Sequence, residues 1–329
     1  MLLALAVLAL PAFAKDIENK KSSGISWPVP WDEMLVLRYD VTQEQRKERK
    51  DKPNTGYSGS YVATISGRRV ENGYEQSWQS DHNRYSLLTP DPIMDAMVNS
   101  LAESTKDKPL VLTLDDEGYY QSLRDADVWT LIIRKAMQEA LEAYFVGTDA
   151  YKAMTAVAQA DARRAFQKQM APMMDAIGSE QYVSGMLSKV PSVFNDFAGG
   201  GLQLGQDIDF EHESENPLGG KPYPMNIHVR IDRAEDPAFV NITVRSRLNA
   251  EKASPILLEA VKKLLPELAA KGMKDGEIQA LFKQMDVRGD IEYRINTETG
   301  IVHYLNIVES KQFPGRLDVE TTKMVLKQL

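Results

Sequence analysis

The sequence predicts an α+β protein in which antiparallel strands form a curved sheet, or a half-barrel, packed against helices. Short segments near both ends of the chain alternate apolar and polar residues, and they are rich in β-branched and aromatic side chains. About sixty residues with helical periodicity separate the two regions. Turn residues such as Asn72-Gly73 join the strand-like segments, which favours antiparallel pairing. The pattern is compatible with two sheets or with one continuous curved sheet.

The composition excludes several classes of protein. Of the 329 residues, 43% are hydrophobic and none is cysteine, so the fold depends on its apolar core without disulfides. The formal net charge of -8 argues against a general nucleic-acid or anionic-membrane binder, because such proteins need a surplus of Lys and Arg. We therefore expect no nucleic acid among the partners.

The chain opens with the features of a secretory signal peptide. An apolar run at residues 2–10 is followed by Pro11 and the small-residue pattern Ala12-Phe13-Ala14, which predicts cleavage between Ala14 and Lys15. The run is shorter than the roughly 20 residues that cross a bilayer, so we expect no permanent membrane span after cleavage. No Lys or Arg precedes the run, and we therefore expect either an upstream start or a misassigned start codon. The prediction is a periplasmic or secreted protein.

Residues 15–32 are polar at first and then rich in proline and tryptophan, and they are predicted to form a flexible tether. Residues 33–124 form the first strand-rich region, with one amphipathic helix at 90–102. Its last two strands flank the turn Asp115-Asp116-Glu117-Gly118 and predict a hairpin. The strands expected in this region are 34–41, 57–65, 74–78, 85–88, 110–114 and 119–123, with His82-Asn83 as a turn.

Residues 125–200 are predicted to be a helical insert. Apolar stripes at helical spacing indicate two long helices, broken at Gly147-Thr148-Asp149 with Thr148 as a cap, and a third helix that ends near Pro191. Methionine is dense here, which suits either a helix-to-sheet core or an adaptable surface for apolar partners, and core filling is the more frequent role. Gly199-Gly200-Gly201 is interpreted as a hinge back into strands.

Residues 201–329 form the second strand-rich region, which begins with an acidic strip. Acidic residues occupy every odd position from 207 to 215, as in a strand with one wet face. A strand at 240–247 would bring Arg245 and Arg247 to this acidic face. A hairpin about residues 218–219 predicts five cross-strand pairs: Asp207 with Arg230, Ile208 with Val229, Asp209 with His228, Phe210 with Ile227, and Glu211 with Asn226.

The remainder of this region combines two helices with three strands. Ser254-Pro255 is predicted to start one helix that Gly272 closes, and Asp275 is predicted to cap the next. Strands are expected at 291–295 and 301–308. The last segment, 317–326, alternates well enough for a closing strand, with a helix as the alternative.

The chain lacks the motifs of the common catalytic and metal sites. His212 stands where a calcium loop beginning at Asp207 needs glycine, and four histidines without cysteine do not make a zinc pattern. Neither G-x-S-x-G nor S-x-x-K of the serine hydrolases occurs. Gln206 takes the place of the lysine in a phosphate loop. We therefore predict no catalytic, cofactor-binding or metal-ligating residue.

The order of turns and segments carries one resemblance. The turn at Asp115 to Gly118, the helical insert, the hairpin near Gly205 and the late turn Thr297-Glu298-Thr299-Gly300 together resemble an uncharacterised family, a domain of unknown function, of exported bacterial α+β proteins. The resemblance spans most of the chain after residue 14 and implies an exported antiparallel protein with helices. At the level of fold alone, such a sheet is similar to the half-barrels of periplasmic lipoprotein carriers, whose concave side holds acyl chains.

These observations favour an exported, non-enzymatic binding protein for a lipid or another apolar ligand. An envelope interaction or assembly protein that binds no small ligand is the alternative. A hydrolase that uses scattered acids, or a Ser and a His brought together by folding, is the third hypothesis, and a cluster of His82, His228 or His303 with Ser and Asp in a cleft would favour it. The candidate residues for the lining of an apolar cavity are Phe210, Ile227, Val229, Ile242 and Val244.

Overall fold

The computed structural model describes residues 24–32, 34–90, 92–105, 108–214, 216, 221–264 and 274–328. The predicted signal peptide, residues 1–14, lies outside the described residues, and so does its cleavage site at Ala14 and Lys15. Residues 15–23 of the predicted tether also lie outside them.

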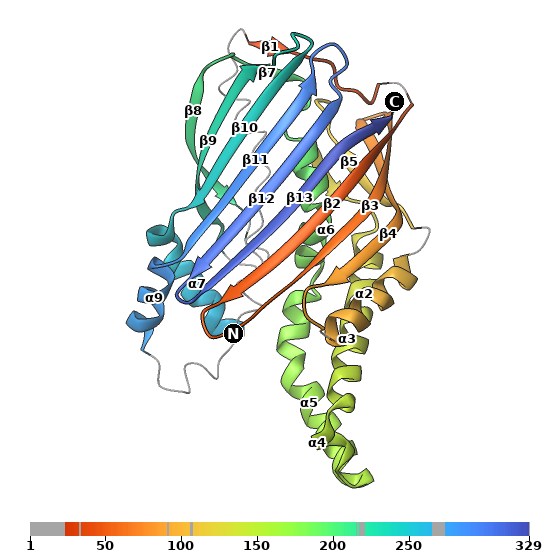
Figure 1. The fold of residues 1–329 in the computed structure, drawn as a ribbon, viewed down its shortest axis with the longest axis vertical. Helices are drawn as coiled ribbons and strands as arrows, with labels where there is room; N and C mark the ends of the chain where they lie inside the picture. Colours follow the sequence, from red (N-terminus) through yellow and green to blue (C-terminus); the bar gives the residue numbers. More distant parts are fainter. Residues whose placement is uncertain are drawn as a thin grey trace.

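Within the described residues, eleven antiparallel strands form one curved sheet in the order β6-β5-β4-β3-β2-β13-β12-β11-β10-β9-β8 (Figure 1). Strands β2 and β13 come from opposite ends of the chain, and their pairing joins the two strand-rich regions. The predicted α+β class with a curved antiparallel sheet is confirmed. The strands are β2 (Leu35–Arg49), β3 (Lys52–Val70), β4 (Gly73–Leu87), β5 (Leu110–Leu114), β6 (Tyr120–Leu123), β8 (Asp207–Ser214), β9 (Tyr223–Arg233), β10 (Phe239–Leu248), β11 (Asp286–Asn296), β12 (Val302–Phe313) and β13 (Arg316–Gln328).

Each strand follows the period-two alternation of its sequence. On β2, Leu37, Tyr39 and Val41 are buried on the inner face, while Val36 on the outer face is 50% exposed. The final segment is a strand, β13, and not a helix. The alternation therefore gives the sheet one buried inner face and one solvated outer face.

The two strands predicted at 74–78 and 85–88 are a single strand, β4. His82 has a positive φ of 58°, and the pairing of β4 with β3 shifts in register between Ser60 and Val62. The predicted turn at His82-Asn83 is therefore an irregularity inside a paired strand, because Asp81 and Arg84 on either side of it both pair with β3.

Residues 24–32 are not the flexible tether that was predicted. Strand β1 (Ile25–Ser26) pairs with β7 (Gly200–Leu202), and the indoles of Trp27 and Trp31 are buried. The indole nitrogen of Trp27 donates a hydrogen bond of 2.8 Å to the carbonyl oxygen of Phe197. The prediction was wrong here because large aromatic side chains anchor a segment that lacks regular structure.

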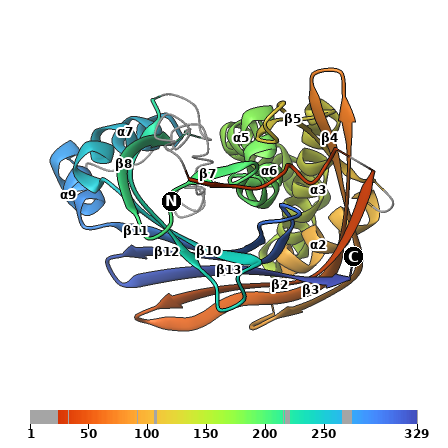
Figure 2. The same cartoon turned by 90° about the horizontal axis from the view of Figure 1, so that it is seen from above.

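The helices form two groups over the inner side of the sheet. Figure 2 shows α3, α5 and α6 over one half and α7 with α9 at the other end. The helices α3 to α5 also extend beyond the end of the sheet as an arm (Figure 1). No helix in the described part of the chain is both long and apolar enough to cross a membrane. The helices are α2 (Pro92–Thr105), α3 (Ala126–Gly147), α4 (Asp149–Lys152), α5 (Ala156–Ile177), α6 (Glu180–Phe194), α7 (Ala250–Leu264) and α9 (Asp275–Lys283).

Several helix boundaries differ from the prediction. Helix α7 begins at Ala250, before Ser254-Pro255, and the backbone N–H of Lys252 bonds to the side-chain oxygen of Asn249 at 3.2 Å. The hydroxyl of Ser254, the predicted N-cap, donates to the carbonyl oxygen of Glu251 at 3.2 Å. Pro255 lies inside the helix, where it has no backbone N–H to donate. Gly272, the predicted end of this helix, lies outside the described residues.

Two further helix ends differ from the prediction, and one cap agrees with it. Pro191 lies inside α6 and does not end it. The N-cap of α9 is Lys274, so Asp275 is its first helical residue. Thr148 does cap α4, since its hydroxyl oxygen accepts the backbone N–H of Tyr151 at 3.3 Å.

Candidate functional site

The five residues predicted to line an apolar cavity lie together on the inner face of β8, β9 and β10. Phe210 pairs with Ile227 in the β8–β9 register, and Val229 pairs with Val244 between β9 and β10. Ile227, Val229, Ile242 and Val244 are at most 2% exposed, and Phe210 is partly exposed. The structure therefore places all five in one apolar patch, while their role as a cavity lining stays a prediction.

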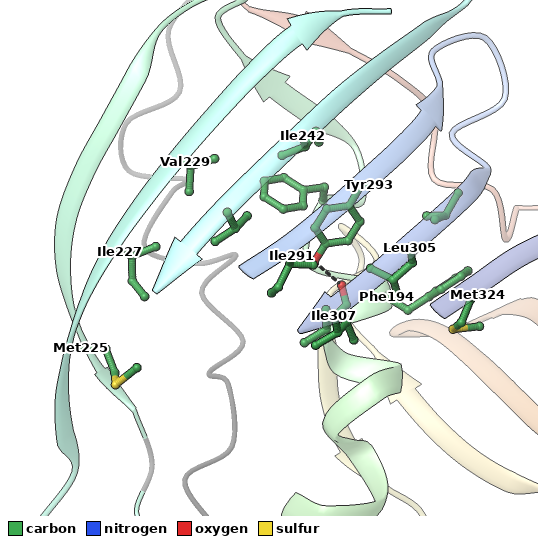
Figure 3. Close-up of a cluster of buried hydrophobic side chains, with 14 of the residues drawn as sticks. Phe194, Met225, Ile227, Val229, Ile242, Ile291, Tyr293, Leu305, Ile307 and Met324 are labelled. Atoms are coloured by element: carbon green, nitrogen blue, oxygen red, sulfur yellow. Dashed lines mark hydrogen bonds between the residues drawn. The ribbon is translucent and has the colours of Figure 1, made fainter. Parts of the chain in front are cut away.

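The apolar patch continues across the next three strands. Figure 3 shows Ile291 and Tyr293 of β11, Leu305 and Ile307 of β12, and Met324 of β13 on the same face as Val229 and Ile242. The sequence showed the alternation of these strands but not which strand lies beside which. We call the following set the apolar field: Phe210, Ile227, Val229, Ile242, Val244, Ile291, Tyr293, Leu305, Ile307 and Met324.

The C-terminal end of α6 fixes one border of the apolar field. The hydroxyl of Tyr293 donates a hydrogen bond of 2.9 Å to the carbonyl oxygen of Val193 (Figure 3). The ring of Phe194 packs edge-on against Tyr39, with 5.5 Å between the ring centroids. Burial raises the pKa of Tyr293 well above its usual value, so this hydroxyl stays protonated and acts as a donor.

A cavity of about 10 Å³ beside Phe194 and Trp31 has room for roughly one water molecule.

The other border of the apolar field is charged. Along β12, Ile307 is followed on the same face by Glu309 and Lys311, which pair with Glu320 and Asp318 of β13. Among the described residues, five cations and three carboxylates share this end of the inner face. We call the set the inner charge cluster: Lys47, Arg49, Lys189, Glu309, Lys311, Arg316, Asp318 and Glu320.

Lys189 of α6 connects the helix to the inner charge cluster. Its ammonium lies 2.9 Å from a carboxylate oxygen of Glu309 and 3.4 Å from one of Glu320. The side chain of Glu309 is 3% exposed, so this is a buried ion pair. Burial alone would lower the pKa of Lys189, but the two carboxylates outweigh it and raise this pKa above its usual value. Lys189 is therefore charged and holds α6 against the sheet.

Two arginines lie opposite each other on neighbouring strands, at the end of the cluster nearest the β2–β3 and β12–β13 turns. Arg49 of β2 lies directly opposite Arg316 of β13 in the strand register. The Nε of Arg316 donates to Asp318 at 2.6 Å. The Nε of Arg49 and the Nη1 of Arg316 are buried without a hydrogen-bond partner among the described residues. Burial lowers the pKa of Lys47; Asp318 and Glu320 oppose this shift, while Arg316 and Arg49 add to it.

Sequence reasoning missed this cluster, and instead singled out the acidic strip, whose described members Asp207 to Glu213 lie on the outer face. The strip has the predicted β8–β9 register. Asp207 accepts from Arg230 at 3.1 Å, and Asp209 lies 3.0 Å from the ring of His228. Glu211 pairs with Lys252 of α7 at 2.7 Å. In the described part of the chain, no three His, Asp or Glu side chains converge as a metal ion requires.

Arg245 and Arg247 do not form ion pairs with the acidic strip, contrary to the prediction. Their nearest carboxylates are on β11: Arg245 lies 4.0 Å from Asp290, and Arg247 lies 2.9 Å from Asp286. The prediction failed because β11, which pairs with the other side of β10, offers acids in direct register.

The three histidines considered for a hydrolase lie on separate strands. His82 is on β4, His228 is on β9 beside Asp207 and Asp209, and His303 is on β12. His303 packs edge-on against Phe239 at 4.8 Å. Burial lowers the pKa of His303, and Arg294 lowers it further. The structure therefore does not bring these three side chains together.

The comparisons with known proteins give no family and one distant structural likeness. No protein-family model matches the chain, and no curated protein sequence matches it significantly. One similar solved structure is that of lipovitellin, described by the words "lipid-protein interactions in lipovitellin", with 10% sequence identity and a TM-score of 0.44. The alignment covers 89% of this chain and 25% of lipovitellin, so the chain spans about a quarter of that protein. A likeness of this size carries no argument about function.

Proposed function

We propose that the chain is an exported, non-enzymatic protein that binds an apolar ligand on the inner face of its sheet. The observation that carries the proposal is the apolar field, a set of neighbouring apolar side chains, all buried except Phe210, from six adjacent strands on the inner side of a curved sheet. Small-molecule sites are mostly apolar, with a few polar groups that fix orientation. The inner charge cluster lies where such groups are needed.

Ligand entry is expected to require motion. Four of the five predicted lining residues are at most 2% exposed, so a ligand reaches them only when a helix group shifts on the sheet. Binding that waits for a conformational change is slower than ordinary association, which proceeds at about 10⁵–10⁷ M⁻¹ s⁻¹. A slow, concentration-independent phase in stopped-flow binding would be its kinetic signature.

Export is the second part of the proposal. It is supported by the apolar run at 2–10, the Ala12-Phe13-Ala14 pattern and the resemblance to an exported family. Location in the periplasm or outside the cell is tested by N-terminal sequencing of protein recovered from those fractions. A mature chain that starts at Lys15 is expected, and recovery only from the cytoplasm with residues 1–14 attached would contradict export.

Binding is tested with a neutral fluorescent apolar probe, 1-N-phenylnaphthylamine. Val229 and Val244 are register partners, so the double variant V229T/V244T adds two hydroxyls at nearly constant volume, and the hydroxyls can bond to each other. We expect the probe to bind about tenfold more weakly to this variant, because its apolar surface would then lie against two hydroxyls instead of two methyl groups. T243V, a change on the outer face of β10, is the matched control and should leave binding unchanged. Equal affinity for all three proteins, or no binding to any, would contradict the proposal.

One observation favours the alternative of an interaction protein. The tip of the arm carries exposed apolar side chains, with Val157 75% and Tyr144 48% exposed. Beneath them, Phe145 stacks on Phe166 at 4.3 Å, which stiffens the tip. Clustered exposed apolar residues often mark contact sites. In a pull-down from envelope extracts, V157D should lose a partner that A160D, a change on the same helix, retains.

A further inference from the structure

The inner charge cluster ends at two adjacent hairpin turns. The backbone N–H of Lys50, in the β2–β3 turn, donates to the carbonyl oxygen of Gly315, in the β12–β13 turn, at 3.0 Å. This contact holds Arg49 and Arg316 side by side at the end of the sheet. Phe313 covers the same corner, with its ring centroid 5.9 Å from the guanidinium carbon of Arg316.

The two arginines are incompletely neutralised. Like charges directly opposite each other on neighbouring strands destabilise a sheet. Asp318 forms an ion pair with Arg316, while Glu309 and Glu320 form ion pairs with Lys189. Among the described residues, no carboxylate lies within ion-pair distance of Arg49.

The unpartnered nitrogens belong to groups that recognise anions. A guanidinium presents a planar fork of donors that matches the two oxygens of a carboxylate or a phosphate. Buried donors are nearly always hydrogen-bonded in folded proteins, and one without a partner calls for an explanation. Arg49 and Arg316 each have one such nitrogen, and they lie on the face that carries the apolar field.

The inner face between this corner and the apolar field carries Asp318 and Lys311 nearest the arginines, and then Val287 and Gly289 of β11. On β11 the inner residues after Ile291 are Gly289 and Val287, and Val287 lies beside Lys311 of β12. Strands rise about 3.3 Å per residue, so the row of Arg316 and the row of Ile291 are roughly 20 Å apart. A ligand that touches both must have a long chain.

We propose that Arg49 and Arg316, with Lys47 beside them, bind the carboxylate or phosphate head group of a long-chain amphiphile whose alkyl chain runs along β11 into the apolar field. The proposal rests on the proposed function and names the class of its ligand. The head group supplies a second anion for this pair of arginines, of which Arg316 already has Asp318, and the chain supplies the apolar contacts.

The test compares oleate with oleyl alcohol, which has the same chain without the charge, by calorimetry on the full chain. We expect oleate to bind about tenfold more tightly or better. R49Q should remove this preference and leave the affinity for oleyl alcohol unchanged. R46Q, on the exposed outer face of the same strand, should keep the preference. Octanoate, which is too short to reach the apolar field from the arginines, should bind at least tenfold more weakly than oleate.

Stability measurements separate binding from folding. R49Q removes one of two opposed like charges, so its melting temperature without ligand should equal or exceed that of the wild type. R49K keeps the charge but loses the fork, and it should retain only part of the preference for oleate.

The binding results for oleate, oleyl alcohol and phosphate distinguish a failure of the head-group site from a failure of the proposed function. Equal affinity for oleate and oleyl alcohol in the wild type would overturn the anion site and leave the proposed function standing. If neither binds, the proposed function fails and the head-group site fails with it. If inorganic phosphate alone binds, dependent on Arg49, while neither amphiphile does, the site takes a free anion and the assignment to an amphiphile is overturned.

Discussion

The hydroxyl of Tyr39 donates a hydrogen bond of 2.7 Å to the carbonyl oxygen of Val302, a residue 263 positions away in the sequence. Tyr39 lies on β2 and Val302 at the start of β12, with β13 between the two strands. Burial raises the pKa of Tyr39, which keeps its hydroxyl protonated as a donor. One side chain thus joins the two strand-rich regions across the middle of the sheet.

The first prediction concerns this bond. Y39F should lower the free energy of unfolding by about 1–2 kcal/mol, because the carbonyl of Val302 loses its buried donor. Urea unfolding should stay a single transition, since the two regions share one sheet. Y144F, at a tyrosine 48% exposed on α3, is the control and should change stability by less than about 0.5 kcal/mol. Two separate transitions would contradict the single sheet.

The second prediction concerns the ion pair of α6 with the sheet. K189M should cost about 1.5–3 kcal/mol, because the buried carboxylate of Glu309 loses the ammonium at 2.9 Å while Lys311 stays 3.7 Å away. K135M removes a pair on α3 whose lysine side chain is 75% exposed, and it should cost less than about 1 kcal/mol. The double variant K189M/E309Q should recover much of the loss. Similar costs for K189M and K135M would show that Lys189 is not the link described above.

The third prediction concerns acid stability. The hydrogen bond from Arg288 lowers the pKa of Asp286 below its usual value of 3.8; burial opposes this shift and Arg247 adds to it. A carboxyl with a lowered folded-state pKa stabilises the fold above its unfolded-state pKa, and this stability is lost as pH falls through the folded-state pKa. The wild type should therefore lose stability below about pH 4 more steeply than D286N.

Unfolding by urea at pH 7, 4, 3 and 2 measures this slope. The control is D290N, at an exposed carboxylate 4.0 Å from its nearest arginine. The assignment fails if D286N and the wild type lose stability in parallel between pH 4 and pH 2.

The fourth prediction concerns the segment that was expected to be a tether. Gly300 has φ of 70°, and a Cβ there would lie 1.9 Å from the carbonyl oxygen of Pro28. Gly315 has φ of 75°, and a Cβ there would meet no atom within 4 Å. G315A should therefore cost about 1–2 kcal/mol from backbone strain alone, and G300A should cost clearly more because it also displaces residues 28–30. Equal costs would mean that residues 24–32 do not pack against the sheet as described.

The sequence was sufficient for most strands and for one register, but not for β1 or for the continuity of β4. The pairs Asp207 with Arg230 and Phe210 with Ile227 follow from period-two alternation about a short turn, and the structure has both. Local alternation fixes which residues share a face, and a hairpin fixes which strands are neighbours. The pairing of β2 with β13 was not predictable in this way, because no short turn connects them.

The inner charge cluster could not be predicted from the sequence either, because it depends on contacts between segments that are far apart in the chain. Its members come from residues 47–49, 189 and 309–320, and each of these segments alone reads as an ordinary solvated surface. One signal was present. Glu309 and Lys311 occupy the same alternate positions of β12 as Leu305 and Ile307. The period-two pattern therefore predicts that these two charged side chains face the inner side of the sheet. Charged residues at inward positions of a strand therefore mark candidate sites in such sequences.

An amphipathic ligand on the inner face is the main proposal for this protein, and native mass spectrometry of the chain purified without detergent is its sharpest test. We expect a stoichiometric excess mass that solvent extraction recovers as a long-chain molecule with a carboxylate or phosphate group. A mass that matches the bare polypeptide, together with no uptake of oleate or oleyl alcohol by the same preparation, would contradict the proposal.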